Sequence, residues 1–137
     1  MKPFTFTALP SRVVFGTGTL SQVPTEIKNL GCNKALILTG PRQAQKGKFL
    51  EGSIGNLAAG LYTNATMHTP VHITEDAMKA VERLHPDCVI ALGGGSAIGL
   101  AKAIALRTDL PQIVIPTTYS GSEVCKRILT YILHASV

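Results

Sequence analysis

The sequence predicts an α/β fold in which a mainly parallel sheet carries helices on both faces. Short apolar runs of strand length alternate along the chain with stretches whose apolar residues recur at helical spacing. The runs lack the polar alternation of a half-exposed strand, as is typical of parallel strands covered on both sides. The 137 residues are 45% hydrophobic and 15% charged, so one domain with a substantial core is expected.

The N-terminal half is expected to hold three strands and two helices. Residues 12–15 form a brief apolar strand, and residues 20–30 show helical spacing. Residues 35–38 are a continuous apolar strand. Residues 43–56 have a helical pattern that three glycines weaken, and residues 60–66 are expected to form a strand.

The C-terminal half continues the same alternation. Thr74 is expected to cap a helix that runs to residue 84, with acidic residues in its first turn. Residues 88–92 are a strand, and a glycine turn at residues 93–95 leads into a further helix. After a loop, residues 112–115 form another buried strand.

The glycine turn at residues 93–95 is the most informative local feature. It joins a strand to a helix whose first turn Ser96 is expected to cap. A helix start presents free backbone N–H groups and partial positive charge, and glycines let an anion approach them, so a phosphate fits there. The alternative is a turn that only brings helix and strand close together, because neither the GxGxxG nor the P-loop pattern is complete.

Four loops are expected to gather at the carboxyl edge, the edge of the sheet at which the strands end. They are residues 39–42, 67–70, 93–96 and 116–122, which are rich in Gly, Thr, Ser or His and contain no Asp or Glu. Ligands of parallel α/β sheets bind beyond this edge. The sequence therefore predicts a pocket for an anionic nucleotide.

Composition excludes several other classes. Aromatic residues are only 5% and Trp is absent, which argues against base-stacking nucleic-acid modules. Cys32, Cys88 and Cys125 lie far apart in the sequence and are interpreted as reduced thiols, neither a disulfide framework nor a metal site. No apolar run has the length of a signal peptide core or a membrane span. A cytoplasmic protein without nucleic-acid or membrane partners is expected.

Three stretches resemble the iron-containing alcohol dehydrogenase family. They are PSRVVFG at residues 10–16, GGGSAIGLAKA at residues 93–103 and PTTYSGSEV at residues 116–124. Gly99, where many members have an acid, the short Thr-Thr loop and His68-Thr69-Pro70 favour the maleylacetate reductase branch. The resemblance covers about residues 4–124 and implies a Rossmann-like domain.

The resemblance implies a binding site for NADH or NADPH. The glycines of the turn and Ser96 would hold the pyrophosphate, the two threonines after residue 116 would line the adenosine side, and Ser122 the nicotinamide side. The implied cofactor-binding residues are Gly40, Arg42, Gly93, Gly94, Gly95, Ser96, Thr117, Thr118 and Ser122.

Three residues bear on coenzyme choice and catalysis. Gly40 stands where an NAD-preferring member carries an acid, so a 2′-phosphate is not repelled. Arg42 either pairs with that phosphate or is an ordinary surface charge. His68 either acts at the reacting centre as an acid or orienting donor, or only caps backbone groups in its loop. No metal site is expected in this chain, although full-length members can use a divalent metal.

The implied activity is reduction of maleylacetate, a small-molecule substrate, to 3-oxoadipate during breakdown of aromatic compounds. An alcohol or glycerol dehydrogenase and a nucleotide-binding module without turnover are the alternatives. Residues 1–124 are expected to be the NAD(P)-binding domain, and residues 125–137 a tail unlike the family, from a truncation or frameshift. The family's helical second domain is not found in this sequence, so the chain is expected to be inactive alone. Full-length members are expected to be homodimers.

Overall fold

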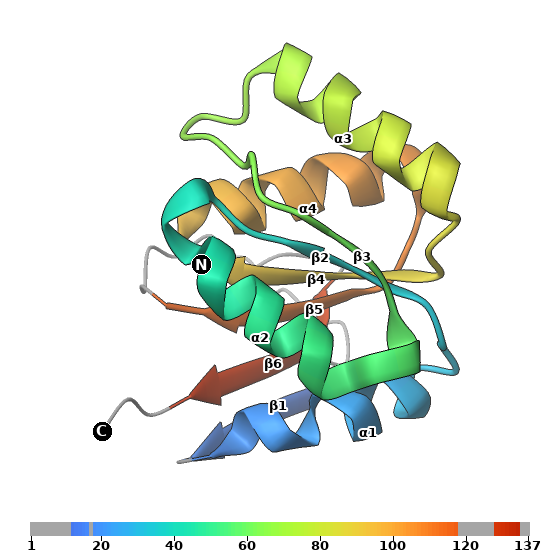
Figure 1. Ribbon diagram of the computed structural model, residues 1–137, viewed down its shortest axis with the longest axis vertical. Coiled ribbons are helices and arrows are strands. Elements are labelled where there is room, and N and C mark those ends of the chain that lie inside the picture. The colour runs from blue at the N-terminus through green and yellow to red at the C-terminus, as the bar shows by residue number, and fades with distance from the viewer. Residues whose placement is uncertain (1–11, 17, 118–127, 135–137) are drawn as a thin grey trace, which may run out of the picture.

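The computed structural model describes residues 12–16, 18–117 and 128–134, which form a six-stranded parallel sheet with helices on both faces (Figure 1). All five strand pairs are parallel, in the order β1-β6-β5-β4-β2-β3. The predicted fold class is confirmed. The strands are β1 (Arg12–Gly16), β2 (Ala35–Leu38), β3 (Ala58–Tyr62), β4 (Cys88–Gly93), β5 (Gln112–Pro116) and β6 (Ile128–His134).

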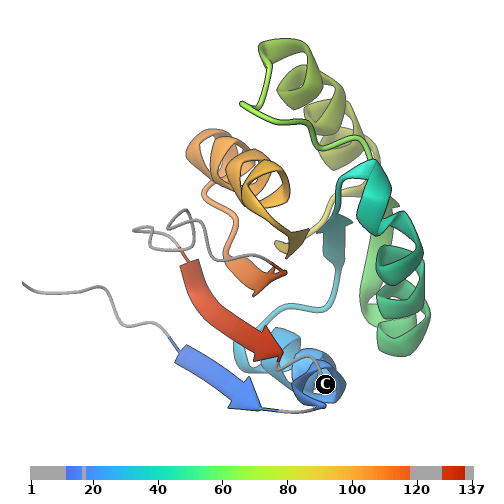
Figure 2. The same ribbon diagram turned by 90° about the vertical axis from the view of Figure 1, so that its left-hand side faces the viewer.

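Within the described residues, four α-helices cover the sheet, two on each face. Helices α1 (Val23–Asn29) and α2 (Ala44–Ile54) lie on one face, and α3 (Val71–Leu84) and α4 (Gly95–Thr108) lie on the other (Figure 2). Three short 3-10 helices complete the connections. They are η1 (Thr19–Gln22), η2 (Pro41–Gln43) and η3 (Gly55–Leu57).

The core consists of two apolar layers, one on each face of the sheet. Successive side chains of a strand point to opposite faces, so Leu36 of β2 packs in the layer beneath α3 and α4. Its neighbour Ile37 packs in the layer that contains Ile27 of α1 and Leu50 of α2. The four residues of β2 and the six of β4 are all buried, which explains their continuous apolar sequence.

Two predicted boundaries are wrong for physical reasons. Helix α3 begins at Val71 after Pro70, and Thr74 does not cap it because the Thr74 side chain is buried inside the helix, at 2% exposure. Strand β3 covers Ala58–Tyr62 rather than residues 60–66. It ends at Tyr62 because the next residues turn toward β2, where the Ala65 amide donates to the Thr39 carbonyl at 3.1 Å.

Strand β6 lies within the segment that the sequence analysis separated as a tail. It pairs with β1 on one side and with β5 on the other, so it joins β1 to the rest of the sheet. The sequence analysis assigned no element to these residues. The domain boundary at residue 124 stays a prediction.

The side on which successive strands are added to the sheet changes between β2 and β4. Strand β3 adds to the outer side of β2, and β4 then returns to the other side of β2. Helix α2, which follows β2, and helix α4, which follows β4, therefore leave the carboxyl edge toward opposite faces (Figure 1). Such a switch point is where open parallel sheets bind ligands. Among the described residues no helix is both long and apolar enough to span a bilayer.

Candidate nucleotide-binding site

The loops that follow β2 and β4 meet at the switch point. A Cβ atom added to Gly40 would lie 3.3 Å from the Ala65 carbonyl oxygen and 3.7 Å from Ser96 Oγ. Gly40, the loop after β3 and the start of α4 are therefore in close contact, as the topology predicts. A side chain at Gly40 would press against the Ala65 carbonyl, so the missing Cβ lets these loops lie close together.

The glycine turn has the strand–turn–helix geometry that the sequence predicts. Gly93 has φ +146°, a conformation that L side chains rarely adopt, and its added Cβ would lie 3.3 Å from the Ala97 Cβ. Helix α4 begins at Gly95, and its first internal bond runs from the Ile98 amide to the Gly94 carbonyl at 3.1 Å. The preceding amides of the first turn have no partner inside the helix.

The prediction that Ser96 caps this helix is wrong. The N-cap position is Gly94, and no side chain caps it. Ser96 lies inside the first turn, where a hydroxyl cannot reach the amides that an N-cap side chain accepts from. Because no side chain among the described residues caps this turn, its amides are free to bind an anion within that part of the chain, which favours the phosphate interpretation of the turn.

The end of β5 adjoins the glycine turn. The Thr117 amide donates to the Gly93 carbonyl at 2.9 Å, and the Thr117 residue is exposed at the carboxyl edge. Thr117 therefore lies beside the glycine turn, and its role in binding the cofactor stays a prediction. Thr118 and Ser122 lie outside the described residues.

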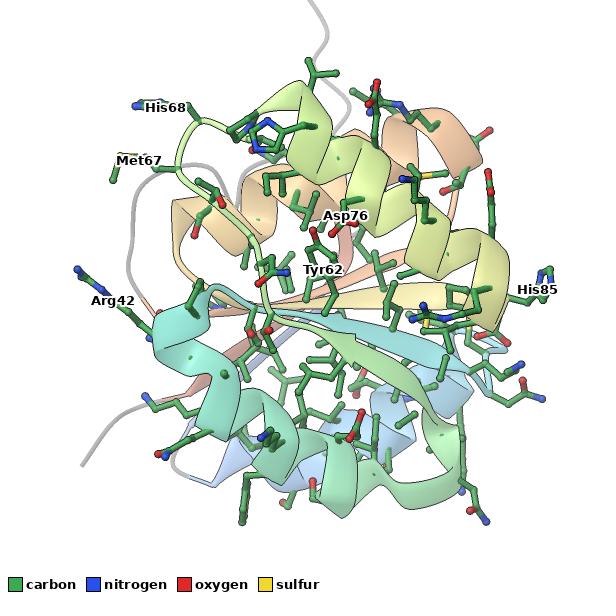
Figure 3. All side chains as sticks on the ribbon, turned by 45° about the horizontal axis from the view of Figure 1, so that its top comes forward. Arg42, Tyr62, Met67, His68, Asp76 and His85 are labelled. Atoms are coloured by element: carbon green, nitrogen blue, oxygen red, sulfur yellow. The ribbon has the colours of Figure 1, made fainter. Side chains whose placement is uncertain are left out.

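Arg42 and His68 both lie at this end of the molecule and are exposed. Arg42 belongs to η2, directly after Gly40, and His68 follows the end of β3 in a loop with Met67. Figure 3 shows all three side chains pointing outward into solvent on the same side of the molecule. The structure therefore places Arg42 and His68 near the predicted pocket, and their functional roles stay predictions.

The loop that carries His68 rests on helix α4. His68 and Thr69 both have positive φ values, 63° and 43°. A Cβ added to Gly99 would lie only 2.6 Å from Thr69 Oγ1, so Gly99 leaves room for this loop. The sequence analysis used Gly99 as a family feature, and the structure gives it a physical role.

Thr39 is a polar residue of the switch point that the sequence analysis did not single out. It is fully buried at the end of β2, with its amide bonded to the Tyr62 carbonyl at 2.8 Å. Its hydroxyl has no hydrogen-bond partner, a state that among the described residues is shared only by the side-chain amide atoms of Gln112. The sequence signal that could have pointed to Thr39 is a threonine placed directly after an apolar strand.

Tyr62 fastens the end of β3 to α3. Its hydroxyl donates to Asp76 Oδ2 at 2.8 Å, and Figure 3 shows the two side chains pointing toward each other. Burial raises the pKa of Tyr62 above its ordinary value, and the Asp76 carboxylate raises it further. This contact ties α3 to the end of β3.

The sheet, the switch point and the glycine turn at a helix start define a Rossmann-like α/β class. The model of the iron-containing alcohol dehydrogenase family matches residues 10–133. The chain belongs to the iron-containing alcohol dehydrogenase family.

Several similar proteins of this family are maleylacetate reductases. The chain is 54% identical over 124 residues to the maleylacetate reductase of a Rhizobium species, which covers 90% of this chain and 35% of that protein. The crystal structure of maleylacetate reductase from Rhizobium matches with a TM-score of 0.93 at 45% identity, over 98% of this chain and 43% of that one. The structure from Agrobacterium tumefaciens matches with a TM-score of 0.91 at 42% identity, with the same coverage.

The chain spans about a third of the length of the curated relatives it matches. The two solved structures named above confirm the Rossmann-like α/β fold over almost the whole chain.

Proposed function

We propose that this chain is the cofactor-binding part of an NAD(P)H-dependent oxidoreductase of the maleylacetate reductase type, which reduces maleylacetate to 3-oxoadipate. The observation that carries the proposal is the 54% identity to a maleylacetate reductase over 90% of the chain. The glycine turn at the switch point supplies the physical support, because it offers backbone amides to a phosphate. A homodimeric full-length enzyme and a cytoplasmic location are proposed on the same resemblance.

The residues at the carboxyl edge fit a pyrophosphate. The first-turn amides of α4 begin at Gly95, and no side chain caps them. Gly40 and Gly93 are positions where an added Cβ would come within 3.3 Å of neighbouring atoms, so the backbone there is unusually close to its surroundings. In the proposed complex these amides donate to the pyrophosphate oxygens, and the bound nicotinamide supplies the hydride.

Coenzyme choice is proposed to depend on Gly40 and Arg42. A carboxylate in place of Gly40 would repel the 2′-phosphate of NADPH, and glycine does not. Arg42 follows in η2 and is exposed, so its guanidinium can turn toward a 2′-phosphate at this edge. We therefore expect the chain to bind both NADH and NADPH.

Binding is tested by titrating the 137-residue chain with NADH and NADPH, followed by cofactor fluorescence and thermal stability. Gly94→Val should weaken binding of both by about tenfold or more, because the side chain stands between the phosphate and the helix start. Gly52→Val is the matched control, since Gly52 lies on α2 with no atom within 4 Å of an added Cβ.

Arg42→Ala should weaken the binding of NADPH more than the binding of NADH. A folded Gly94→Val chain with unchanged affinity would contradict the proposed phosphate site. The unsubstituted 137-residue chain is expected to bind the cofactor without reducing maleylacetate. The absorbance of the reduced cofactor measures whether any reduction takes place. Turnover of an alcohol or glycerol instead would favour the dehydrogenase alternative.

A further inference from the structure

Two of the cysteines meet an aspartate at the edge of the sheet opposite the glycine turn. Cys32 follows α1, Asp87 follows α3, and Cys88 begins β4. The two sulfur atoms and a carboxylate oxygen of Asp87 all lie within 4.8 Å of one another. Cys32 and Cys88 are far apart in the sequence, and the parallel pairing of β2 with β4 brings their segments together, with Ala35 opposite Cys88. Both are free thiols.

Backbone groups hold this cluster in a fixed arrangement. The Asn33 amide donates to Asp87 Oδ2 at 2.8 Å, and the Lys34 amide donates to Asp87 Oδ1 at 2.9 Å. The Asp87 amide in turn donates to the Lys34 carbonyl at 2.8 Å. The Cys32 thiol donates to the Asp87 carbonyl at 3.4 Å. Contacts of this kind orient the ligands of protein metal sites.

The three residues of the cluster differ in burial, and Asp87 is the most exposed of them. Cys88 is fully buried and Cys32 is 8% exposed, whereas Asp87 is half-buried. An ion can therefore reach the thiols from the side of Asp87. Two sulfur ligands and one oxygen ligand suit a thiophilic ion such as Zn²⁺, while Mg²⁺ and Ca²⁺ require oxygen ligands.

We propose that Cys32, Asp87 and Cys88 form a binding site for a thiophilic divalent cation, Zn²⁺ foremost, with water as the fourth ligand. On binding, both thiols lose their protons to solvent and two metal–sulfur bonds form, with no change of oxidation state. The bound ion would tie the connection between α1 and β2 to the start of β4. The site lies away from the glycine turn and does not depend on the proposed function.

Co²⁺ is the probe for this site, because its thiolate complexes have a charge-transfer band that Zn²⁺ abolishes by displacement. The experiment uses the reduced 137-residue chain with Cys125→Ser, which removes the third thiol. We expect the band to saturate at about one Co²⁺ per chain. Cys32→Ser on this background should weaken the band and lower the affinity at least about tenfold. The unsubstituted chain is the matched control and should give the same band as Cys125→Ser.

A second measurement keeps the test valid if Cys32→Ser does not fold. Zn²⁺ should slow alkylation of Cys32 by iodoacetamide in the Cys125→Ser chain at least about tenfold, whereas Mg²⁺ should leave the rate unchanged. A folded, reduced chain without the cobalt band, or Cys32→Ser with an unchanged band, would overturn the proposal. Equal alkylation rates with and without Zn²⁺ would do the same.

Discussion

Thr39 illustrates how much depends on single residues at the switch point. Its side chain is packed tightly, since a Cβ added to Gly47 would lie 2.9 Å from the Thr39 methyl group. Its hydroxyl is nevertheless buried without a hydrogen-bond partner. A buried polar group in this state costs free energy, and it costs none if a ligand or water completes the bond.

Thr39→Val therefore tests the state of this hydroxyl. Valine keeps the shape of threonine and removes the unpaired oxygen, so we expect the free energy of unfolding to rise by about 1–2 kcal/mol. Urea unfolding of the cofactor-free chain measures it. Thr108→Val is the control, because the Thr108 hydroxyl donates to the Ile104 carbonyl at 2.8 Å. Its free energy of unfolding should fall by about 0.5–1.5 kcal/mol. A destabilised Thr39→Val chain would show that the hydroxyl is satisfied.

Tyr62 gives a prediction about pH. Its pKa is raised in the folded chain, so the folded state favours the neutral phenol. This contribution to stability is complete below the pKa of an unfolded tyrosine, about 10, and is lost as the pH rises above that value. Tyr62→Phe should therefore lower stability at about pH 8 and lose less stability than the unsubstituted chain between about pH 8 and 11.

Urea midpoints of both chains at the two pH values provide the measurement. Below the titration range the hydroxyl bond to Asp76 is expected to contribute about 0.5–1.5 kcal/mol, since Asp76 is exposed. An identical pH dependence of the two chains would mean that Tyr62 titrates as an ordinary tyrosine.

At the scale of elements, the contact between α4 and the loop before α3 determines where His68 lies. Gly99 is the point of contact, and Thr69 is the residue seated on it. The positive φ values of His68 and Thr69 show that the loop takes an uncommon path to reach this position. Any side chain at position 99 is expected to move the loop.

A double-mutant cycle measures this contact. Gly99→Ala places a methyl group against the Thr69 hydroxyl, while alanine also favours the helix by about 1 kcal/mol. In a Thr69→Ala background the clash is absent, so Gly99→Ala should there be neutral or stabilising. The two backgrounds are expected to differ by about 1–2 kcal/mol in urea unfolding. Equal effects in both would exclude a direct contact.

Elements whose signals are local could be predicted from the sequence. The apolar runs of β2, β4 and β5 and the glycine turn before α4 were predicted because each is encoded in a few consecutive residues. The Thr74 cap failed because the same pattern fits a threonine buried against the core. The cluster of Cys32, Asp87 and Cys88 was missed because Cys32 lies 55 positions before Asp87 and meets the other two only through strand pairing.

At the scale of the whole molecule, the attachment of β1 to the rest of the described sheet depends on β6. Strand β1 has β6 as its neighbour, and β6 connects it to β5. The described strands β2, β3, β4 and β5 form a continuous sheet without β6. We therefore expect two regions of different stability.

Thr130→Pro should separate these regions. Thr130 is opposite Arg12 in β1 and opposite Ile113 in β5, and proline in a central strand removes a ladder hydrogen bond. Amides of β1 should lose their protection from hydrogen exchange, while those of β2 and β4 keep theirs. Thr130→Val, which keeps the backbone N–H donor, is the control and should leave the protection of all these amides unchanged. Loss of protection throughout would show a single cooperative unit.

The pairing of β1 with β6 also has a consequence for the order of events on the ribosome. Arg12 pairs with Thr130, so roughly a hundred residues are translated between the two partners. At ~5–20 residues per second the wait is on the order of ten seconds, longer than local helices and hairpins need to form. During synthesis β2 to β5 can assemble while β1 has no neighbour. Among the six described strands, β1 is therefore translated first and cannot pair until β6 has been made.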